Sequence, residues 1–265
     1  MKLNIVPARN GLTWVKLGVS TFFKQPLALA GLFFLYMGAM WGLAQIPLVG
    51  SAISALLVPA TTLGMMAAAQ QAASGKFPMP TVLLSAFRVG RERARAMIVL
   101  GLLYGAGWFA SITLAGLISP QPPAQETTTA AGQAQLAGFY LIVSLFSLPL
   151  SVLFWHAPAL VHWHGVAPVK SLFFSMVACF RNFGALFVFG LVWLAVFLAA
   201  ISASTLLAVA IGGPPMVERV FLPLVMLLAA MFTTSIYFSF RDSFVSDEAP
   251  TPESPNDATH PGRPN

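Results

Sequence analysis

Hydrophobic residues in this chain form long blocks that contain no charged residue, unlike the short periodic patterns of a soluble domain. A helix of about 20 apolar residues is long enough to cross the roughly 30 Å hydrocarbon layer of a bilayer. The blocks free of Asp, Glu, Lys and Arg lie between Lys24 and Lys76, Arg95 and Glu126, Glu126 and Lys170, Arg181 and Glu218, and Arg219 and Arg241. This pattern predicts an all-α membrane protein with six spans, at residues 26–46, 48–73, 96–119, 136–161, 183–211 and 220–240.

The connections between these blocks divide the predicted spans into three hairpins. The short turn IPLVG (46–50) joins the first two spans, SPQPPAQETTTAAGQAQ (119–135) the third and fourth, and GGPPMVER (212–219) the fifth and sixth. We therefore expect one polytopic domain over residues 1–245. Residues 246–265 are acidic and rich in proline without apolar periodicity, which predicts a disordered tail.

A similar segment precedes each odd-numbered span. These segments read GLTWVKLGVSTFFKQP (11–26), TVLLSAFRVGR (81–91) and PVKSLFFSMVACFRNFG (168–184). Each carries a phenylalanine followed by a basic residue just before its span. Two interpretations remain open: convergence on a common way of entering the membrane, or three repeats of an interfacial helix plus a helical hairpin, related by an axis along the membrane normal.

Two of these segments have the periodicity of an amphipathic helix, which suits the membrane interface. In the first, apolar residues recur at helical spacing opposite a polar face that carries Lys16 and Lys24. The expected apolar positions are Leu12, Val15, Val19 and Phe22 in the first segment, and Leu172, Phe173, Met176, Val177 and Phe180 in the third.

Composition excludes a water-soluble protein. Charged residues make up 8% of the chain and hydrophobic residues 57%, whereas soluble domains carry about a quarter charged residues. The pI near 9.9 would suggest nucleic acid in a soluble chain, but the positive-inside rule is the better explanation here. Of the fourteen Lys and Arg residues, all except Arg219 fall on one side of the six-span arrangement. This bias predicts a bacterial inner-membrane protein with both termini in the cytoplasm.

Basic residues beside the spans are candidates for contact with anionic lipid headgroups. The candidates are Lys16, Lys24, Arg88, Arg91, Arg93, Arg95, Lys170 and Arg181. No binding fold or interleaved aromatic pattern surrounds the arginines, so we expect no nucleic acid as a partner. Membrane lipids and other membrane proteins are the expected partners.

Three histidines, His156, His162 and His164, lie in WHAPALVHWHG near the end of the fourth span, and they are candidates for a polar function. A metal site needs three or four convergent ligands, whereas His162 and His164 point to different faces of a helix. We therefore expect these side chains to pack at the interface. The single cysteine, Cys179, excludes an intrachain disulfide.

No catalytic or cofactor motif is present, and none of the expected spans contains Asp, Glu, Lys or Arg. Proton-coupled transporters usually keep such a group at membrane depth. We therefore expect a non-catalytic membrane protein, without a cofactor, that acts as a binding or scaffold protein. The alternatives are a transporter or permease for a small or lipid-like substrate and, third, an intramembrane enzyme using the histidines.

The stretch VPARNGLTWVKLGVSTFFKQPLALAGLFFLY (6–36), followed by IPLVG and LLVPATTLG, resembles a family of proteobacterial multi-pass inner-membrane proteins whose function is uncharacterised. The resemblance is clearest over residues 5–75. More loosely, the plan of an interfacial helix plus two spans is similar to the membrane domain attached to some glycerophosphodiester phosphodiesterases. The chain has no soluble phosphodiesterase domain, so the resemblance implies location and topology but no functional residues.

Overall fold

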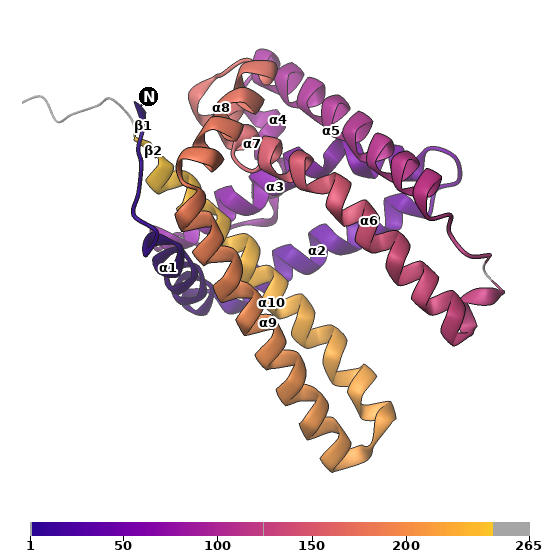
Figure 1. The fold of residues 1–265 in the computed structure, drawn as a ribbon. Coiled ribbons are helices and arrows are strands. Elements are labelled where there is room, and N and C mark those ends of the chain that lie inside the picture. The colour runs from indigo at the N-terminus through magenta and orange to yellow at the C-terminus, as the bar shows by residue number, and fades with distance from the viewer. Residues whose placement is uncertain (1, 124, 246–265) are drawn as a thin grey trace, which may run out of the picture.

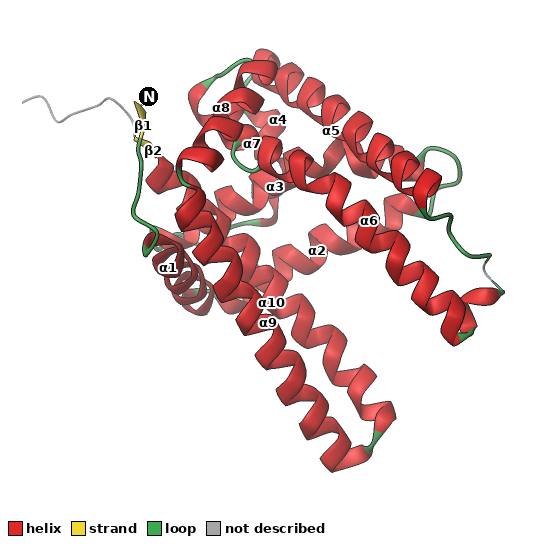
Figure 2. Ribbon diagram, viewed as in Figure 1, coloured by secondary structure: helices red, strands yellow, loops and turns green. Residues whose placement is uncertain are grey.

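The computed structural model describes residues 2–123 and 125–245, which are almost entirely helical (Figures 1 and 2). Six helices are long and apolar enough to cross a membrane, and they form three hairpins. These helices are α2 (Pro26–Ala44), α3 (Gly50–Ala73), α5 (Arg91–Ile118), α6 (Ala130–Phe154), α9 (Phe183–Gly212) and α10 (Pro214–Ser243).

Shorter elements connect and flank these spans. They are β1 (Lys2–Leu3), α1 (Asn10–Lys24), η1 (Pro80–Leu84), α4 (Ser85–Arg88), η2 (Glu126–Thr128), α7 (Ala157–His164), α8 (Pro168–Arg181) and β2 (Phe244–Val245). A short element that the sequence predicts to be interfacial thus stands before each hairpin: α1 before α2, η1 and α4 before α5, and α8 before α9. The tail expected to be disordered, 246–265, lies outside the described residues.

Proline and glycine set several helix boundaries. Pro26 begins α2, and Gln25 before it leaves the helical conformation, with φ −143° and ψ 62°. At the end of α7, Gly165 adopts a left-handed conformation with φ 65°, and its N–H donates to the carbonyl of Leu160. Glycine takes this conformation without a steric penalty, so α7 ends there.

The fourth span, predicted over 136–161, is interrupted near its end. Helix α6 ends at Phe154 and α7 begins at Ala157. Pro158 lies in the first turn of α7 and has no N–H to continue the preceding helix. Ser175 of α8 covers the break: its Oγ accepts from the His156 N–H at 3.0 Å and donates to the Val152 carbonyl at 2.9 Å.

The interfacial elements pack in a cyclic order. Helix α1 packs against α10 and α9, η1 and α4 pack against α3, and α8 packs against α6. Each of these elements except α1 therefore contacts the second span of the preceding hairpin. Helix α1, which has no preceding hairpin, contacts the second span of the last hairpin, α10. Rotation of one unit about an axis along the membrane normal would produce this order. The sequence repeat itself stays a prediction.

The faces of α1 and α8 differ from the simple expectation. In α1, Leu12 is exposed, while Trp14 and Gly18 are buried, because this helix packs against the spans α9 and α10. A Cβ on Gly18 would overlap Ser235 of α10, so only glycine permits this approach. In α8 the small residues face the protein, and the ring of Phe173 is 55% exposed.

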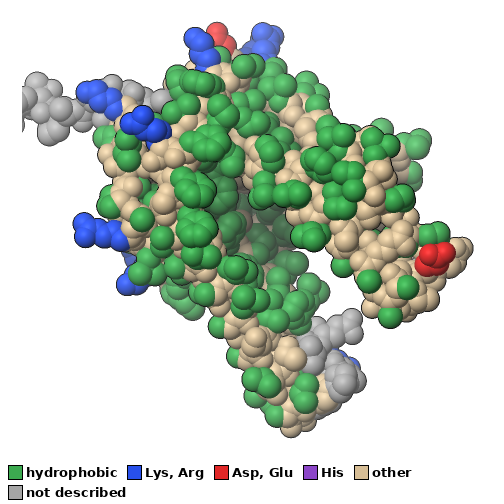
Figure 3. Space-filling view, in the orientation of Figure 1, with side chains coloured by type: hydrophobic (Ala, Val, Ile, Leu, Met, Phe, Trp, Pro, Cys, Tyr) green, Lys and Arg blue, Asp and Glu red, His purple; other side chains and the backbone are tan. Residues whose placement is uncertain are grey.

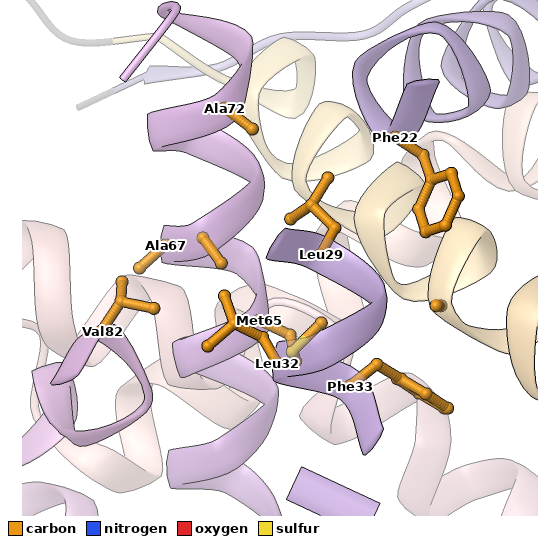
Figure 4. Close-up of a cluster of buried hydrophobic side chains, with 10 residues drawn as sticks. Phe22, Leu29, Leu32, Phe33, Met65, Ala67, Ala72 and Val82 are labelled. Carbon is orange, nitrogen blue, oxygen red and sulfur yellow. The ribbon is translucent and has the colours of Figure 1, made fainter. Parts of the chain in front are cut away.

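Helix α3 is the centre of the molecule. In the most apolar stretch of 18 residues in α3, 56% is buried, whereas the corresponding share in the other five spans is 11–22%. Figure 4 shows Met65, Ala67 and Ala72 of α3 within a cluster that includes Leu29 of α2 and Val82 of η1. The other spans mostly expose apolar surface, as expected of helices that face lipid.

The two ends of the described chain meet beside α9. Strand β1 pairs antiparallel with β2. The buried side chain of Asn182 accepts from the Val6 N–H and donates to the Asn4 carbonyl and the Ser243 Oγ, at 2.9, 3.0 and 3.2 Å. This contact fixes the segment before α1 against the end of α10, which supports the packing of α1 on the last hairpin.

Candidate functional site

Seven of the eight predicted headgroup contacts are exposed: Lys16, Lys24, Arg88, Arg91, Arg95, Lys170 and Arg181. Most Lys and Arg side chains visible in Figure 3 lie at the end of the molecule that carries α1, β1 and the start of α5. The opposite ends of the hairpins are largely hydrophobic or uncharged in this view. The side chains are therefore positioned for headgroup contact, which stays a prediction.

Arg93 differs from the other candidates because it is half-buried. Its guanidinium donates to the backbone carbonyl of His162 in the last turn of α7. Carbonyls at the end of a helix lack intrahelical partners and carry partial negative charge, which a cation there stabilises. Arg93 thus fastens the start of α5 to α7.

The three histidines lie in different surroundings. His156 is 1% exposed and contacts the rings of Phe240 and Phe244, His162 is buried, and His164 is half-buried. The Nδ1 atoms of His156 and His162 are buried without a hydrogen-bond partner in the described chain. Among residues 2–123 and 125–245, no group of three or more His, Cys, Asp or Glu is placed to hold a metal ion.

A polar pocket of about 420 Å³ lies between α3, the η1–α4 segment and α7. His162 is the only predicted polar candidate that lines it, together with Arg88 from the headgroup candidates. The other polar lining residues are Gln70, Gln71, Thr81 and Ser85. This site is not visible in the sequence because its members come from three separate segments; the adjacent glutamines at the end of a span are the available signal.

An apolar cleft of about 410 Å³ lies between α6 and α9, which do not pack closely against each other. Phe183 and Phe187 of α9 line one wall, and Leu148 and Val152 of α6 line the other. The remaining lining residues are Ser151, Trp155, Cys179, Phe180, Leu186, Phe189, Gly190 and Phe232. The cleft lies near the C-terminal end of α6 and the N-terminal end of α9, beside the last turn of α8.

A smaller cavity of about 160 Å³ adjoins this cleft and shares Ser151 and Trp155 with it. It extends toward α3, where Pro59 lines it, and toward α7, where Pro158 does. Trp155 is held by its indole N–H, which donates to the Ser239 Oγ of α10 at 3.0 Å. Two of the prolines within the predicted spans, Pro59 and Pro158, therefore line this cavity.

Cys179 lies in α8 at the edge of the apolar cleft. Burial raises the pKa of its thiol to about 12, and the Sγ atom is 3.6 Å from the Val152 carbonyl oxygen. A thiol with so high a pKa stays protonated at neutral pH and is a poor nucleophile. Its role here is packing against the break between α6 and α7.

A probable inner membrane protein of Burkholderia thailandensis is 33% identical to this chain over 267 residues, which cover 97% of this chain and 98% of the relative. No family model and no solved structure matches the chain. The similarity extends over nearly the whole length of both proteins, including all six spans, and confirms the resemblance drawn from residues 5–75. The chain therefore belongs to the family of this probable inner membrane protein, and it is a multi-pass protein of the inner membrane.

Proposed function

We propose that the protein is a non-catalytic lipid-binding protein of the inner membrane, and that its ligand is a phospholipid whose acyl chain occupies the cleft between α6 and α9. The observation that carries this proposal is the cleft itself, about 410 Å³ and lined almost entirely by aromatic and aliphatic side chains. Its volume falls within the range of about 300–1,000 Å³ that is usual for small-ligand sites.

The surroundings of the cleft favour a phospholipid over other apolar ligands. The cleft separates two helices that otherwise face the bilayer, whose acyl chains are the most abundant apolar molecules there. Helix α8 lies above it with Lys170 near one end and Arg181 at the other, and both side chains are exposed. A lipid with its chain in the cleft would place its phosphate near these cations.

The orientation proposed from the basic residues places this headgroup in the cytoplasmic leaflet, with both termini in the cytoplasm. Single cysteines test it in a Cys179→Ala background. Thr128→Cys, between α5 and α6, should react with an impermeant thiol reagent added outside intact cells, whereas Phe77→Cys, between α3 and η1, should react only after permeabilisation. The reverse result would place the basic end outside and overturn the orientation.

Filling the cleft tests lipid binding. Gly190 lines the cleft, and a Cβ added there meets no atom within 4 Å, so Gly190→Trp should fill the space without disturbing the backbone. Gly138→Trp on α6 is the matched control, because its Cβ also meets nothing and Gly138 is outside the cleft. Native mass spectrometry of the detergent-purified protein should show retained phospholipid for the wild type and Gly138→Trp, and loss of it for Gly190→Trp.

Equal retention by all three proteins would show that the cleft is not the lipid site. The non-catalytic part of the proposal has its own test: phospholipids incubated with the purified protein should be recovered unchanged by mass spectrometry. A new lipid product that accumulates with the wild type would contradict it.

The cavity that adjoins the cleft favours one alternative, a permease for a lipid-like substrate. It leads from Ser151 and Trp155 toward Pro59 in the central helix, and proline kinks allow spans to bend. In liposomes, a permease would accelerate movement of a fluorescent phospholipid between leaflets, and Gly190→Trp would slow it. A lipid-binding protein without transport would leave the rate at that of protein-free liposomes.

A further inference from the structure

The polar pocket between α3, η1–α4 and α7 is distinct from the apolar cleft, and the two share no lining residue. Gln70 and Gln71 enter it from the last turns of α3, Ser85 and Arg88 from α4, and His162 from α7. These are hydrogen-bond donors of different kinds gathered around one space of about 420 Å³.

Two of these polar groups lack a hydrogen-bond partner among residues 2–123 and 125–245. The Ser85 Oγ and the His162 Nδ1 are both buried without a hydrogen bond in the described chain, and His162 is only 7% exposed. Buried polar atoms in native proteins are nearly always satisfied by protein, water or a ligand. Because both residues line the pocket, a molecule within it is positioned to supply the missing partner.

The charge of the pocket is positive. Arg88 lines it, and no Asp or Glu is among its lining residues. A second polar pocket lies next to it, shares Gln70 and Gln71, and is lined by Lys76 and Arg241. Arg241 forms an ion pair with Asp242 at 2.8 Å. Arg88 in the first pocket and Lys76 in the second have no acidic partner among the described residues.

The four arginines of residues 88–95 therefore have separate roles. Arg93 donates to the His162 carbonyl and holds α7 in place, whereas Arg91 and Arg95 are exposed and do not line the pocket. Among the described residues, Arg88 is the arginine that lines the pocket, and its guanidinium has no described partner. A guanidinium beside amide, hydroxyl and imidazole donors is a typical environment for an oxyanion.

We infer that this pocket binds a phosphate group, held by the Arg88 guanidinium with Ser85, His162 and the two glutamines as neutral donors. The phosphate can belong to the headgroup of an anionic phospholipid, because the pocket lies at the interfacial end of α3, or to free inorganic phosphate. The site does not depend on lipid occupying the apolar cleft, so Gly190→Trp should leave it unchanged.

The experiment compares variants in nanodiscs and with two probes. Protein in phosphatidylcholine nanodiscs is titrated with inorganic phosphate by calorimetry, and native mass spectrometry measures retention of phosphatidylglycerol from mixed nanodiscs. Arg88→Gln should weaken binding of the effective probe by roughly tenfold, the scale of a charge-assisted hydrogen bond. Arg91→Gln removes the same charge from the same stretch and should change binding less than about twofold, because Arg91 is exposed and does not line the pocket.

Ser85→Ala separates binding from structure. Its hydroxyl has no partner in the described protein, so its removal should leave the thermal stability of the free protein unchanged while weakening binding. Binding of phosphatidylglycerol alone would identify a lipid headgroup as the source, and binding of inorganic phosphate as well would identify a free anion; both support the site. No binding of either probe, or equal losses in Arg88→Gln and Arg91→Gln, would overturn it.

Discussion

The junction between α3 and α5 and the junction between α6 and α9 have equivalent places in the fold, since each joins the second span of one hairpin to the first span of the next. At the first junction the helices pack closely: Gly101 of α5 lies against the backbone of Leu56, and Gly105 lies near Ala55. At the second, Phe183 and Phe187 of α9 line an open cleft.

Side-chain size explains the difference. Lipid tails are as apolar as the helices, so spans associate where small residues let their backbones approach. Glycines on α5 permit that approach to α3, whereas phenylalanine rings on α9 hold α6 at a distance. Helix α8 contacts both α6 and α9 at the second junction, and the cleft lies between these three helices.

The largest expected effect comes from putting a bulky residue where α3 and α5 contact each other closely. In Gly101→Leu, the new Cβ would overlap the Leu56 carbonyl oxygen, a backbone atom that cannot rotate away. We expect a loss of about 3 kcal/mol or more in the free energy of unfolding, at the upper end of overpacking effects. Thermal unfolding in detergent and abundance in membranes would measure it.

Gly116→Leu on the same helix is the control, because a Cβ there meets no atom within 4 Å. It should be as stable as the wild type. If the two variants were equally stable, α3 and α5 would not pack through Gly101, and the contrast between the two junctions would disappear.

A smaller effect is expected at the break that shapes the open junction. Ser175→Ala removes the hydroxyl that joins the His156 N–H to the Val152 carbonyl, and leaves the buried His156 N–H and the partly buried Val152 carbonyl without this partner. The expected cost is about 1–3 kcal/mol. Chemical unfolding in detergent would measure it, with Ser144→Ala as the control because the exposed Ser144 hydroxyl bonds only to the carbonyl of Tyr140 in its own helix.

A wild-type stability for Ser175→Ala would contradict this account of the break. A second result would extend the comparison: if α8 shapes the cleft through Ser175, this variant should also retain less phospholipid, whereas Ser144→Ala should not.

The sequence allowed the membrane spans to be predicted because their information is local. A charge-free run such as that between Lys24 and Lys76 can only be buried in lipid, and its turn lies within a single pentapeptide. The break near Pro158 had a visible signal as well, but its position depended on Ser175, which is distant in sequence. Periodicity alone could not choose between Leu12 and Trp14 as the packed residue of α1.

The two candidate sites were much harder to predict because neither belongs to one segment. The polar pocket brings Gln70, Ser85 and His162 together from three elements, and in the sequence each has an ordinary explanation as an interface residue. The cleft is a place where two helices fail to pack, and a sequence without a partner structure does not show which phenylalanine faces a gap. The spans, which depend on one segment each, were therefore predictable, whereas the two sites, which depend on contacts between distant segments, were not.

The smallest expected effect concerns Cys179, which lies between the tightly packed break and the open cleft. Its contact with the Val152 carbonyl is a weak sulfur interaction, so Cys179→Ala should cost under about 1 kcal/mol at pH 8. Burial raises the pKa of the thiol to about 12, so the folded protein keeps a proton that the unfolded chain loses near its ordinary pKa. Unfolding then releases a proton above about pH 9, and the stability of the wild type should fall as the pH rises further.

The decline should amount to about 1.4 kcal/mol between pH 8 and pH 10 relative to Cys179→Ala, because the limiting slope of about 1.4 kcal/mol per pH unit applies over the one unit above pH 9. Unfolding of both proteins in the same detergent at each pH would isolate it, because every other titrating group is shared. Parallel pH profiles would mean that the thiol ionises as easily in the folded protein as in the unfolded one. Water would then reach the cleft from the side of α8, and a polar molecule rather than an acyl chain would be its expected occupant.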